Sequence, residues 1–259
     1  MSAGALAGRH AVVTGAGRGI GAAIALALAA QGARLTLLGR KAATLEETAR
    51  QLPPGTATTT LTCDVADEQQ VADAIARARE ALGPVGILVN NAGQAYSAPL
   101  LKTDLATWRR LLDVNLTGAF LCTRACLPDM IAAGHGRIVN VASIAGLTGA
   151  PYITAYCASK HAVIGLTRAL ARELAPRDIT VNAVCPGYTD TDIVRDALAN
   201  IRTKTGRSEA EALAALTAAN PQGRLIAPEE VAHAVLWLCL PGTQSVTGQS
   251  IALAGGEVL

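Results

Sequence analysis

Short apolar runs alternate with longer Ala- and Leu-rich stretches along the whole chain, and this pattern predicts strands alternating with helices. The expected strands are His10–Thr14, Arg34–Leu38, Thr58–Thr62, Gly86–Val89, Arg137–Ala142, Ile179–Val184 and Ser250–Leu253. The expected helices are Gly19–Gln31, Lys41–Gln51, Asp67–Leu82, Asp104–Ala132, Ala155–Leu174 and Pro228–Leu240. The strands are continuous apolar runs, which are typical of a parallel sheet covered on both faces. The pattern therefore predicts an α/β fold with a doubly wound, seven-stranded parallel sheet.

One segment departs from the alternation. More than 40 residues separate Val184 from Pro228, and they include a polar helical stretch over Thr191–Ala219. An excursion of this length is usually a lid or a binding element. It starts at the carboxyl end of a strand, where ligands bind in such sheets. We expect residues 190–220 to form a substrate-binding lid within a single domain spanning residues 1–259, because no linker or repeat divides the chain.

Composition excludes several classes of partner. The chain has 22 basic and 20 acidic residues, a net charge of +2, and only 3% aromatic residues, so it offers no electrostatic attraction for nucleic acid or anionic membrane. The six cysteines form no CxxC pair and have no histidine at a ligand-like spacing, which favours buried free thiols over a zinc site. No signal peptide is evident, and the longest apolar run is too short to cross a bilayer. A cytoplasmic location is expected.

A glycine cluster, TGAGRGIG, follows the first expected strand and opens the first expected helix. Tight turns between a strand and a helix need backbone without a Cβ atom, so that a pyrophosphate can approach the helix N-terminus. Flexible loops also collect glycine, but this position favours a phosphate-binding turn of the Rossmann type. Its glycines are Gly15, Gly17, Gly19 and Gly21.

The second expected strand indicates which dinucleotide binds. NAD-binding domains usually carry a carboxylate there for the ribose hydroxyls, but this strand ends in Gly39-Arg40-Lys41. Arg40, with Arg18 in the glycine turn, suits a 2′-phosphate, because guanidinium pairs with phosphate through two hydrogen bonds. Arg40 as a solvated residue at a helix start is the alternative. We expect NADP(H) as the preferred cofactor, with NAD(H) as the alternative.

Three residues suggest acid–base chemistry. Tyr156 and Lys160 are four residues apart on an expected helix and share one face, and Ser143 follows the fifth expected strand. A free phenol titrates near pH ~10, and a neighbouring ammonium is expected to lower that pKa. Tyr156 would then exchange a proton with a carbonyl or alcohol oxygen, to which Ser143 would donate a hydrogen bond. This chemistry needs no metal.

The order of these motifs resembles that of the short-chain dehydrogenase/reductase family in its compact single-domain branch. The motifs are TGxxxGxG, the segment Asn90-Asn91-Ala92-Gly93, Ser143, the YxxxK pair and Pro186-Gly187. The resemblance covers essentially the whole chain. It implies that Lys160 also holds the nicotinamide ribose and that Asn115, in DVNLTG, supports a proton relay. It further implies cofactor contacts by Gly15, Arg18, Gly19, Ile20, Gly21, Arg40, Asp64, Val65, Asn91, Ala92, Gly93, Tyr156, Lys160, Pro186, Gly187 and Thr189. The expected substrate-binding residues are Ser143, Tyr156 and Tyr188.

The substrate is less well defined. The resemblance is closest to 3-oxoacyl-thioester and polyketide ketoreductases, and a small cyclic ketone, a sugar or a steroid alcohol is the alternative substrate. The excursion carries basic residues that would meet coenzyme A phosphates or an acyl carrier protein, but nearby acidic residues equally favour a solvated helix face. These basic residues are Arg195, Arg202, Lys204 and Arg207. A non-catalytic nucleotide sensor is the alternative from another class of function, although it would not need Ser143, Tyr156 and Lys160.

Other residues near the motifs receive structural interpretations. Tyr152 is expected in a loop or pocket wall, Ser159 on the helix surface, and His161 in a structural role. The apolar helix Asp104–Ala132 resembles helices that pair subunits in the family, so a homotetramer is expected, with a homodimer as the second possibility. Core packing would explain the same apolar residues, Leu111, Leu112, Leu116, Ala119 and Leu127.

Overall fold

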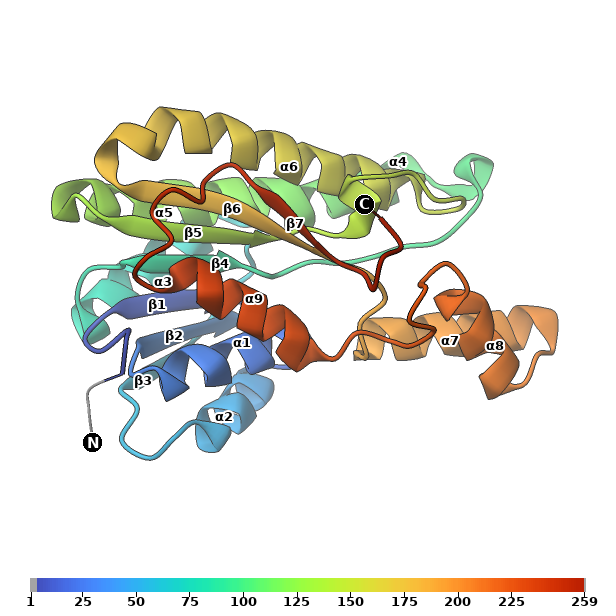
Figure 1. Cartoon of the computed structure of the whole chain (residues 1–259), viewed down its shortest axis with the longest axis horizontal. Coiled ribbons are helices and arrows are strands. Elements are labelled where there is room, and N and C mark those ends of the chain that lie inside the picture. The colour runs from blue at the N-terminus through green and yellow to red at the C-terminus, as the bar shows by residue number, and fades with distance from the viewer. Residues whose placement is uncertain (1–3, 259) are drawn as a thin grey trace.

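The apolar runs pair side by side in one parallel sheet of seven strands in the computed structural model, which describes residues 4–258 (Figure 1). The strand order is β3-β2-β1-β4-β5-β6-β7, so the chain winds outward in both directions from β1 and β4. The α/β fold expected from the sequence is confirmed. The strands are β1 (His10–Thr14), β2 (Arg34–Gly39), β3 (Thr58–Thr62), β4 (Ile87–Asn90), β5 (Gly136–Val141), β6 (Ile179–Pro186) and β7 (Ser250–Leu253).

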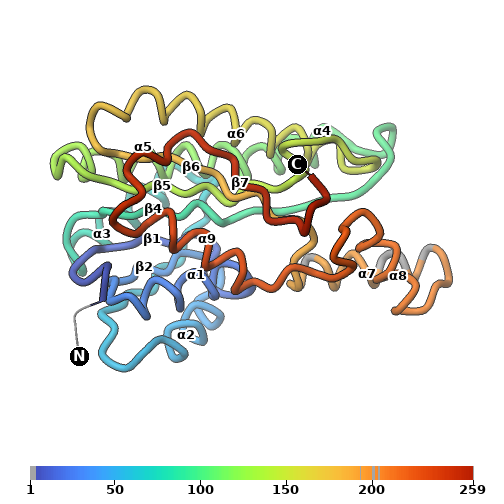
Figure 2. The backbone as a smooth tube through the Cα atoms, in the orientation of Figure 1, coloured from blue at the N-terminus to red at the C-terminus, as the bar shows by residue number. Residues whose placement is uncertain are grey.

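Helices cover both faces of this sheet because both faces carry apolar side chains. The cluster under α1, α2 and α9 contains Ile24, Leu45 and Val235, and the cluster under α3, α5 and α6 contains Ile75, Cys126 and Ala171. Figures 1 and 2 show the two helical layers on opposite sides of the strands. These helices are α1 (Gly19–Ala30), α2 (Ala42–Gln51), α3 (Glu68–Leu82), α5 (Gly118–Ala133), α6 (Thr154–Leu174) and α9 (Pro228–Cys239). The six cysteines are free thiols, and all but Cys157 are buried.

The expected helix Asp104–Ala132 is not regular. It consists of α4 (Leu105–Leu112), a π-helical turn η2 (Asp113–Thr117) and α5, with three short 3₁₀ turns elsewhere at η1 (Leu100–Lys102), η3 (Ile144–Gly146) and η4 (Ala175–Arg177). A π turn adds a residue to the helical repeat and often marks a functional position, and this one contains Asn115. Hydrophobic periodicity cannot detect it, since the apolar residues on both sides remain in helical spacing.

The excursion after β6 forms two helices, α7 (Asp192–Thr205) and α8 (Glu209–Thr217). They lie to one side of the sheet, beyond the end of β6 (Figure 1). The two ends of the excursion are held together, because Asp190 N donates to Ile226 O at 2.9 Å and Ile226 N donates to Tyr188 O at 2.8 Å. Among the described residues, no helix is long and apolar enough to cross a membrane.

Candidate active site

The glycine turn lies at the carboxyl end of β1, where the strand order reverses. Gly15 and Gly19 have φ values of +64° and +52°, which side chains other than glycine rarely adopt. A Cβ atom on Gly21 would collide with the Gly15 carbonyl oxygen and lie 2.5 Å from Asn91 Nδ2. The turn therefore brings the backbone close to the N-terminus of α1, as a bound pyrophosphate requires.

The segment after β4 is fastened to this turn. The backbone N–H groups of Asn91 and Ala92 each donate to Thr14 Oγ1 at 2.9 Å, and Asn91 Nδ2 donates to Thr14 O at 2.9 Å and Gly15 O at 3.2 Å. The Asn91 amide is thus engaged by the turn itself. These hydrogen bonds hold the turn in shape.

The surroundings of the turn fit a dinucleotide with a 2′-phosphate. Arg40 and Lys41 are exposed at the end of β2, and no carboxylate occupies that position. Gly17 lies so close to the side chain of Thr44, at the start of α2, that a Cβ atom would clash with it. Asp64 follows β3 and accepts a hydrogen bond from Ala66 N at 3.1 Å. The turn has glycine backbone where phosphates would approach and exposed cationic side chains beside it, so the residues present suit NADP(H).

Arg18 has a partner that the sequence did not reveal. Its Nη1 atom donates to Asp192 Oδ2, in the first turn of α7, at 2.7 Å. Arg18, the expected phosphate ligand, is therefore paired with a residue of the excursion when no cofactor is bound.

The three catalytic candidates converge at the ends of β5 and β6. Ser143 follows β5, is buried, and forms a hydrogen bond with the Tyr156 side chain of α6. Lys160, one helical turn further on, is buried, and its Nζ atom donates to Val141 O at 2.9 Å. The same Nζ atom would lie 3.5 Å from a Cβ atom on Gly93, which joins this group to the segment after β4.

The electrostatics of Tyr156 differ from our expectation. Burial raises the pKa of Tyr156 to about 12, against an opposing hydrogen bond from Ser143, and burial lowers the pKa of Lys160 to about 8. The prediction that the ammonium lowers the pKa of the phenol is wrong for the chain alone. Lys160 Nζ lies over the Tyr156 ring, 5.7 Å from its centroid, and is bonded to a strand carbonyl, so burial dominates. The phenol is therefore protonated at neutral pH and available as a proton donor.

Asn115 lies behind this group, held on both sides. Its Nδ2 atom donates to Gln94 O at 3.0 Å and to Ser159 Oγ at 2.9 Å, and its Oδ1 atom accepts from Gln94 N at 2.8 Å. Ser159 Oγ in turn donates to Tyr156 O at 2.8 Å. Ser159 is completely buried, so the expectation of a surface position is wrong. Its spacing of three residues from Tyr156 already placed both on one helix face and was the available signal.

The remaining candidates line the end of β6. Ser143 Oγ lies 3.5 Å from Pro186 O, and Thr189 Oγ1 donates to Gly187 O at 3.1 Å. The Tyr188 side chain is 40% exposed, which leaves it available to a substrate.

Tyr152 and His161 agree with their structural interpretations. Tyr152 lies in a loop, with φ +69° and 61% exposure, and its carbonyl accepts from Ala98 N at 2.8 Å. The His161 ring bonds to Cys157 O at 2.9 Å.

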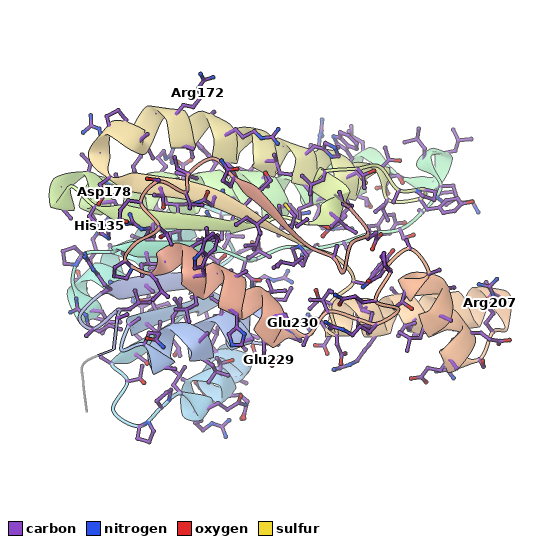
Figure 3. The ribbon with its side chains drawn as sticks, in the orientation of Figure 1. His135, Arg172, Asp178, Arg207, Glu229 and Glu230 are labelled. Atoms are coloured by element: carbon purple, nitrogen blue, oxygen red, sulfur yellow. The ribbon has the colours of Figure 1, made fainter. Side chains whose placement is uncertain are left out.

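The basic residues of the excursion are largely paired. Arg195 forms ion pairs with Asp190 at 3.3 Å and Asp192 at 3.1 Å, and Arg202 pairs with Glu209 at 3.1 Å. Figure 3 shows Arg207 at the end of the excursion away from the sheet. The Lys204 side chain lies outside the described residues. This pairing agrees with the interpretation of a solvated, mixed-charge face.

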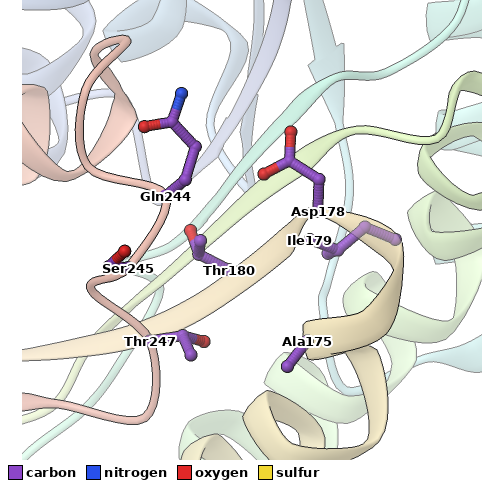
Figure 4. Close-up of a pocket in the computed structure, with 7 residues that line it drawn as sticks. All are labelled: Ala175, Asp178, Ile179, Thr180, Gln244, Ser245 and Thr247. Atoms are coloured by element: carbon purple, nitrogen blue, oxygen red, sulfur yellow. The ribbon is translucent and has the colours of Figure 1, made fainter.

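A hollow of about 230 Å³ lies elsewhere, at the amino end of β6 (Figure 4). Because the catalytic candidates lie beyond the carboxyl ends of β5 and β6, this hollow is at the opposite edge of the sheet and contains none of them. Its lining residues are Ala175, Asp178, Ile179, Thr180, Gln244, Ser245 and Thr247.

Comparisons with known proteins agree with this geometry. A family model described as short chain dehydrogenase matches residues 9–202. The chain is 43% identical to galactitol 2-dehydrogenase (L-tagatose-forming) of Cereibacter sphaeroides, covering 97% of this chain and 95% of that protein. It is 42% identical to cis-4-hydroxycyclohexanecarboxylate dehydrogenase of Sinomonas cyclohexanicum, covering 97% of each. A crystal structure of a single-substitution variant of actinorhodin polyketide ketoreductase with NADPH superposes with a TM-score of 0.93 at 37% identity, covering 99% of both chains.

Proposed function

This chain belongs to the short-chain dehydrogenase family, and we propose that it is an NADP(H)-dependent oxidoreductase that interconverts a carbonyl and a secondary alcohol. The observation that carries the proposal is the convergence of Ser143, Tyr156 and Lys160 beside Gly93, in the segment after β4 that is fastened to the glycine turn. A nucleotide sensor without catalysis would not require this arrangement.

Tyr156 and Ser143 have different roles in the proposed acid–base chemistry. In reduction, the protonated Tyr156 phenol donates its proton to the carbonyl oxygen, while the Ser143 hydroxyl donates a hydrogen bond to the same oxygen as negative charge develops there. In oxidation, the Tyr156 phenol must first release its proton to solvent, and the phenolate then accepts the proton of the alcohol. Asn115 and Ser159 hold the helix segment behind Tyr156 in place.

NADP(H) supplies or accepts the hydride. Its pyrophosphate would lie on the turn at Gly15, Gly19 and Ile20, and its 2′-phosphate beside Arg40 and Arg18. Asp64 and Val65 would contact the adenine, and Gly187 and Thr189 the nicotinamide. The structurally similar actinorhodin ketoreductase, crystallised with NADPH, supports this assignment.

For the substrate, we propose two classes. A 3-oxoacyl thioester is supported by the similarity to the polyketide ketoreductase. A small cyclic ketone or a sugar is supported by the similarity to the two dehydrogenases. Residues 190–220 would close over either substrate, with Tyr188 at the base of this lid.

A panel assay tests the reaction class and separates the two substrates. Oxidation of NADPH would be followed with acetoacetyl-CoA, substituted cyclohexanones and ketohexoses. Turnover of any member supports the oxidoreductase, and the class with the highest kcat/KM identifies the substrate. Absence of turnover across the panel, with NADPH still bound, would favour the sensor.

We also propose a homotetramer acting in the cytoplasm. Leu111 and Ala119 are buried in the core of the chain itself, so they do not provide the interface. The large apolar residues exposed on α5 are Phe120 and Ile131, and Arg124 lies 5.2 Å from the centroid of the Phe120 ring. A mass measured by light scattering would separate tetramer from dimer, and a monomer would overturn the proposal.

A further inference from the structure

The lid and the glycine turn meet at one side of the candidate cofactor site. A Cβ atom on Gly19 would lie 3.1 Å from Thr191 Cγ2, and Arg18 Nη1 lies 2.7 Å from Asp192 Oδ2. The neighbouring residue Gly17 lies on the other side, against Thr44 at the start of α2. Arg18 therefore lies between Gly17, which faces the start of α2, and Gly19, which faces the residue before α7.

The end of β2 is where a 2′-phosphate would lie, because Arg40 follows that strand and no carboxylate opposes it. The Arg18 side chain is 69% exposed and Asp192 is 42% exposed, so neither group is fixed by packing. The Asp192 carboxylate holds the Arg18 guanidinium toward α7, whereas a phosphate bound at the end of β2 would attract it in the other direction.

We propose that Asp192 is a cofactor-specificity residue that competes with the 2′-phosphate of NADP(H) for Arg18. NAD(H), which lacks this phosphate, leaves the Arg18–Asp192 pair intact. NADP(H) must exchange it for a pair between Arg18 and the phosphate. Arg18 and Arg40 alone would produce a preference for NADP(H) over NAD(H). Asp192 thus makes this preference smaller. This inference rests on the proposed function, since it concerns the same cofactor site.

The surrounding charges keep the cost of this exchange small. When Arg18 leaves, Asp192 keeps its ion pair with Arg195 at 3.1 Å, and it remains in the first turn of α7, where the helix dipole favours a negative charge. Arg195 also pairs with Asp190 at 3.3 Å. Neither of these two carboxylates is left without a cation, so the pair can open without exposing an uncompensated buried charge.

Binding measurements test the proposal independently of turnover. Dissociation constants for NADPH and NADH would be measured by cofactor fluorescence with the wild type, Asp192→Asn and Asp190→Asn. Asp190→Asn is the matched control, because it removes the same charge from the same end of the lid, where the carboxylate pairs with Arg195 instead of Arg18. The expected result is that Asp192→Asn tightens NADPH binding about two- to fivefold, the range for an exposed ion pair, with NADH unchanged. Asp190→Asn leaves the NADPH/NADH affinity ratio at the wild-type value.

A double-mutant cycle with Arg18→Gln completes the test. In the Arg18→Gln background, Asp192→Asn should no longer alter NADPH affinity. The inference is overturned if Asp192→Asn leaves the NADPH affinity unchanged, shifts both cofactors equally, or acts without Arg18. Those outcomes leave the oxidoreductase intact, whereas a wild-type chain that binds neither cofactor would overturn both proposals.

Discussion

Ser159 offers a test of how the structure positions Tyr156, the proposed catalytic tyrosine. The Ser159→Ala substitution removes a completely buried hydroxyl that accepts from Asn115 Nδ2 at 2.9 Å and donates to Tyr156 O at 2.8 Å. Asn115 keeps its two hydrogen bonds with Gln94, so only one of its three anchors is lost. Loss of the hydroxyl should cost about 1–2 kcal/mol of stability, which corresponds to about 2–4 °C in Tm for a chain of this size.

The effect on catalysis should exceed the effect of lost stability alone. Because Ser159 connects the π turn to the Tyr156 backbone, its removal should lower kcat about fivefold, equivalent to about 1 kcal/mol of transition-state stabilisation. The cofactor dissociation constant should not change, since the hydrogen bonds of Ser159 go to Asn115 and Tyr156 and not to the glycine turn.

Thr167→Val is the matched control for this experiment. Thr167 lies two turns further along α6, is also completely buried, and uses its hydroxyl for two hydrogen bonds, with Asn140 Nδ2 and Val163 O, each at 2.8 Å. Both variants should lose stability, but only Ser159→Ala should lose kcat. Equal kcat values in the two variants would show that the hydrogen bonds linking Asn115, Ser159 and Tyr156 do not position Tyr156 for catalysis.

Three further predictions concern the glycine turn, Lys160 and the ion pair between Arg224 and Glu230. Gly21→Ala should weaken NADPH binding by about tenfold or more while the protein stays folded, because the added Cβ would collide with the Gly15 carbonyl. Titration with NADPH measures this effect. An unchanged affinity would refute the role of the glycine turn in binding the pyrophosphate. The reductive kcat/KM should be level below the Lys160 pKa of about 8 and fall above it, as the ammonium is lost; a pH–rate profile that stays flat to pH ~10 would contradict this. Glu230→Gln should cost about 1 kcal/mol in a melt at neutral pH, since Glu230 accepts from Arg224 at 2.7 and 2.8 Å on an exposed surface (Figure 3). The pKa of Glu230 is lowered from 4.5 to about 2, mainly by Arg224, so the stabilisation by this ion pair should be complete above pH 4.5 and disappear as the pH falls toward 2. A difference in stability between the wild type and Glu230→Gln that persists at pH 2 would refute this prediction.

The fold could be predicted from sequence because local patterns and global topology agree. Each of the seven expected strands is present, with ends displaced by at most two residues, since buried parallel strands bounded by helices leave a strong periodic signal. The π turn at Asn115 could not be predicted, because it depends on tertiary packing. A Cβ atom on Gly118, the first residue of α5, would lie 2.7 Å from Val65 Cγ2, and the two residues are far apart in sequence.

The closeness of the catalytic candidates could be predicted from the sequence, but several of their contacts could not. Motif spacing brought Ser143, Tyr156 and Lys160 together, because helix and strand geometry fix where such residues lie. The Arg18–Asp192 pair joins residues 174 positions apart, which spacing cannot reveal. The raised pKa of Tyr156 was missed for a related reason: sequence identifies the neighbouring charge but not the degree of burial that outweighs it.

The central claim, that the Tyr156 phenol transfers the proton, is tested most directly by Tyr156→Phe, which keeps the ring and removes the hydroxyl. The measurement is kcat for the best carbonyl of the panel together with the NADPH dissociation constant. We predict that kcat falls at least about 100-fold while the NADPH affinity stays within about twofold of the wild type. Turnover at the wild-type rate in this variant would contradict the account.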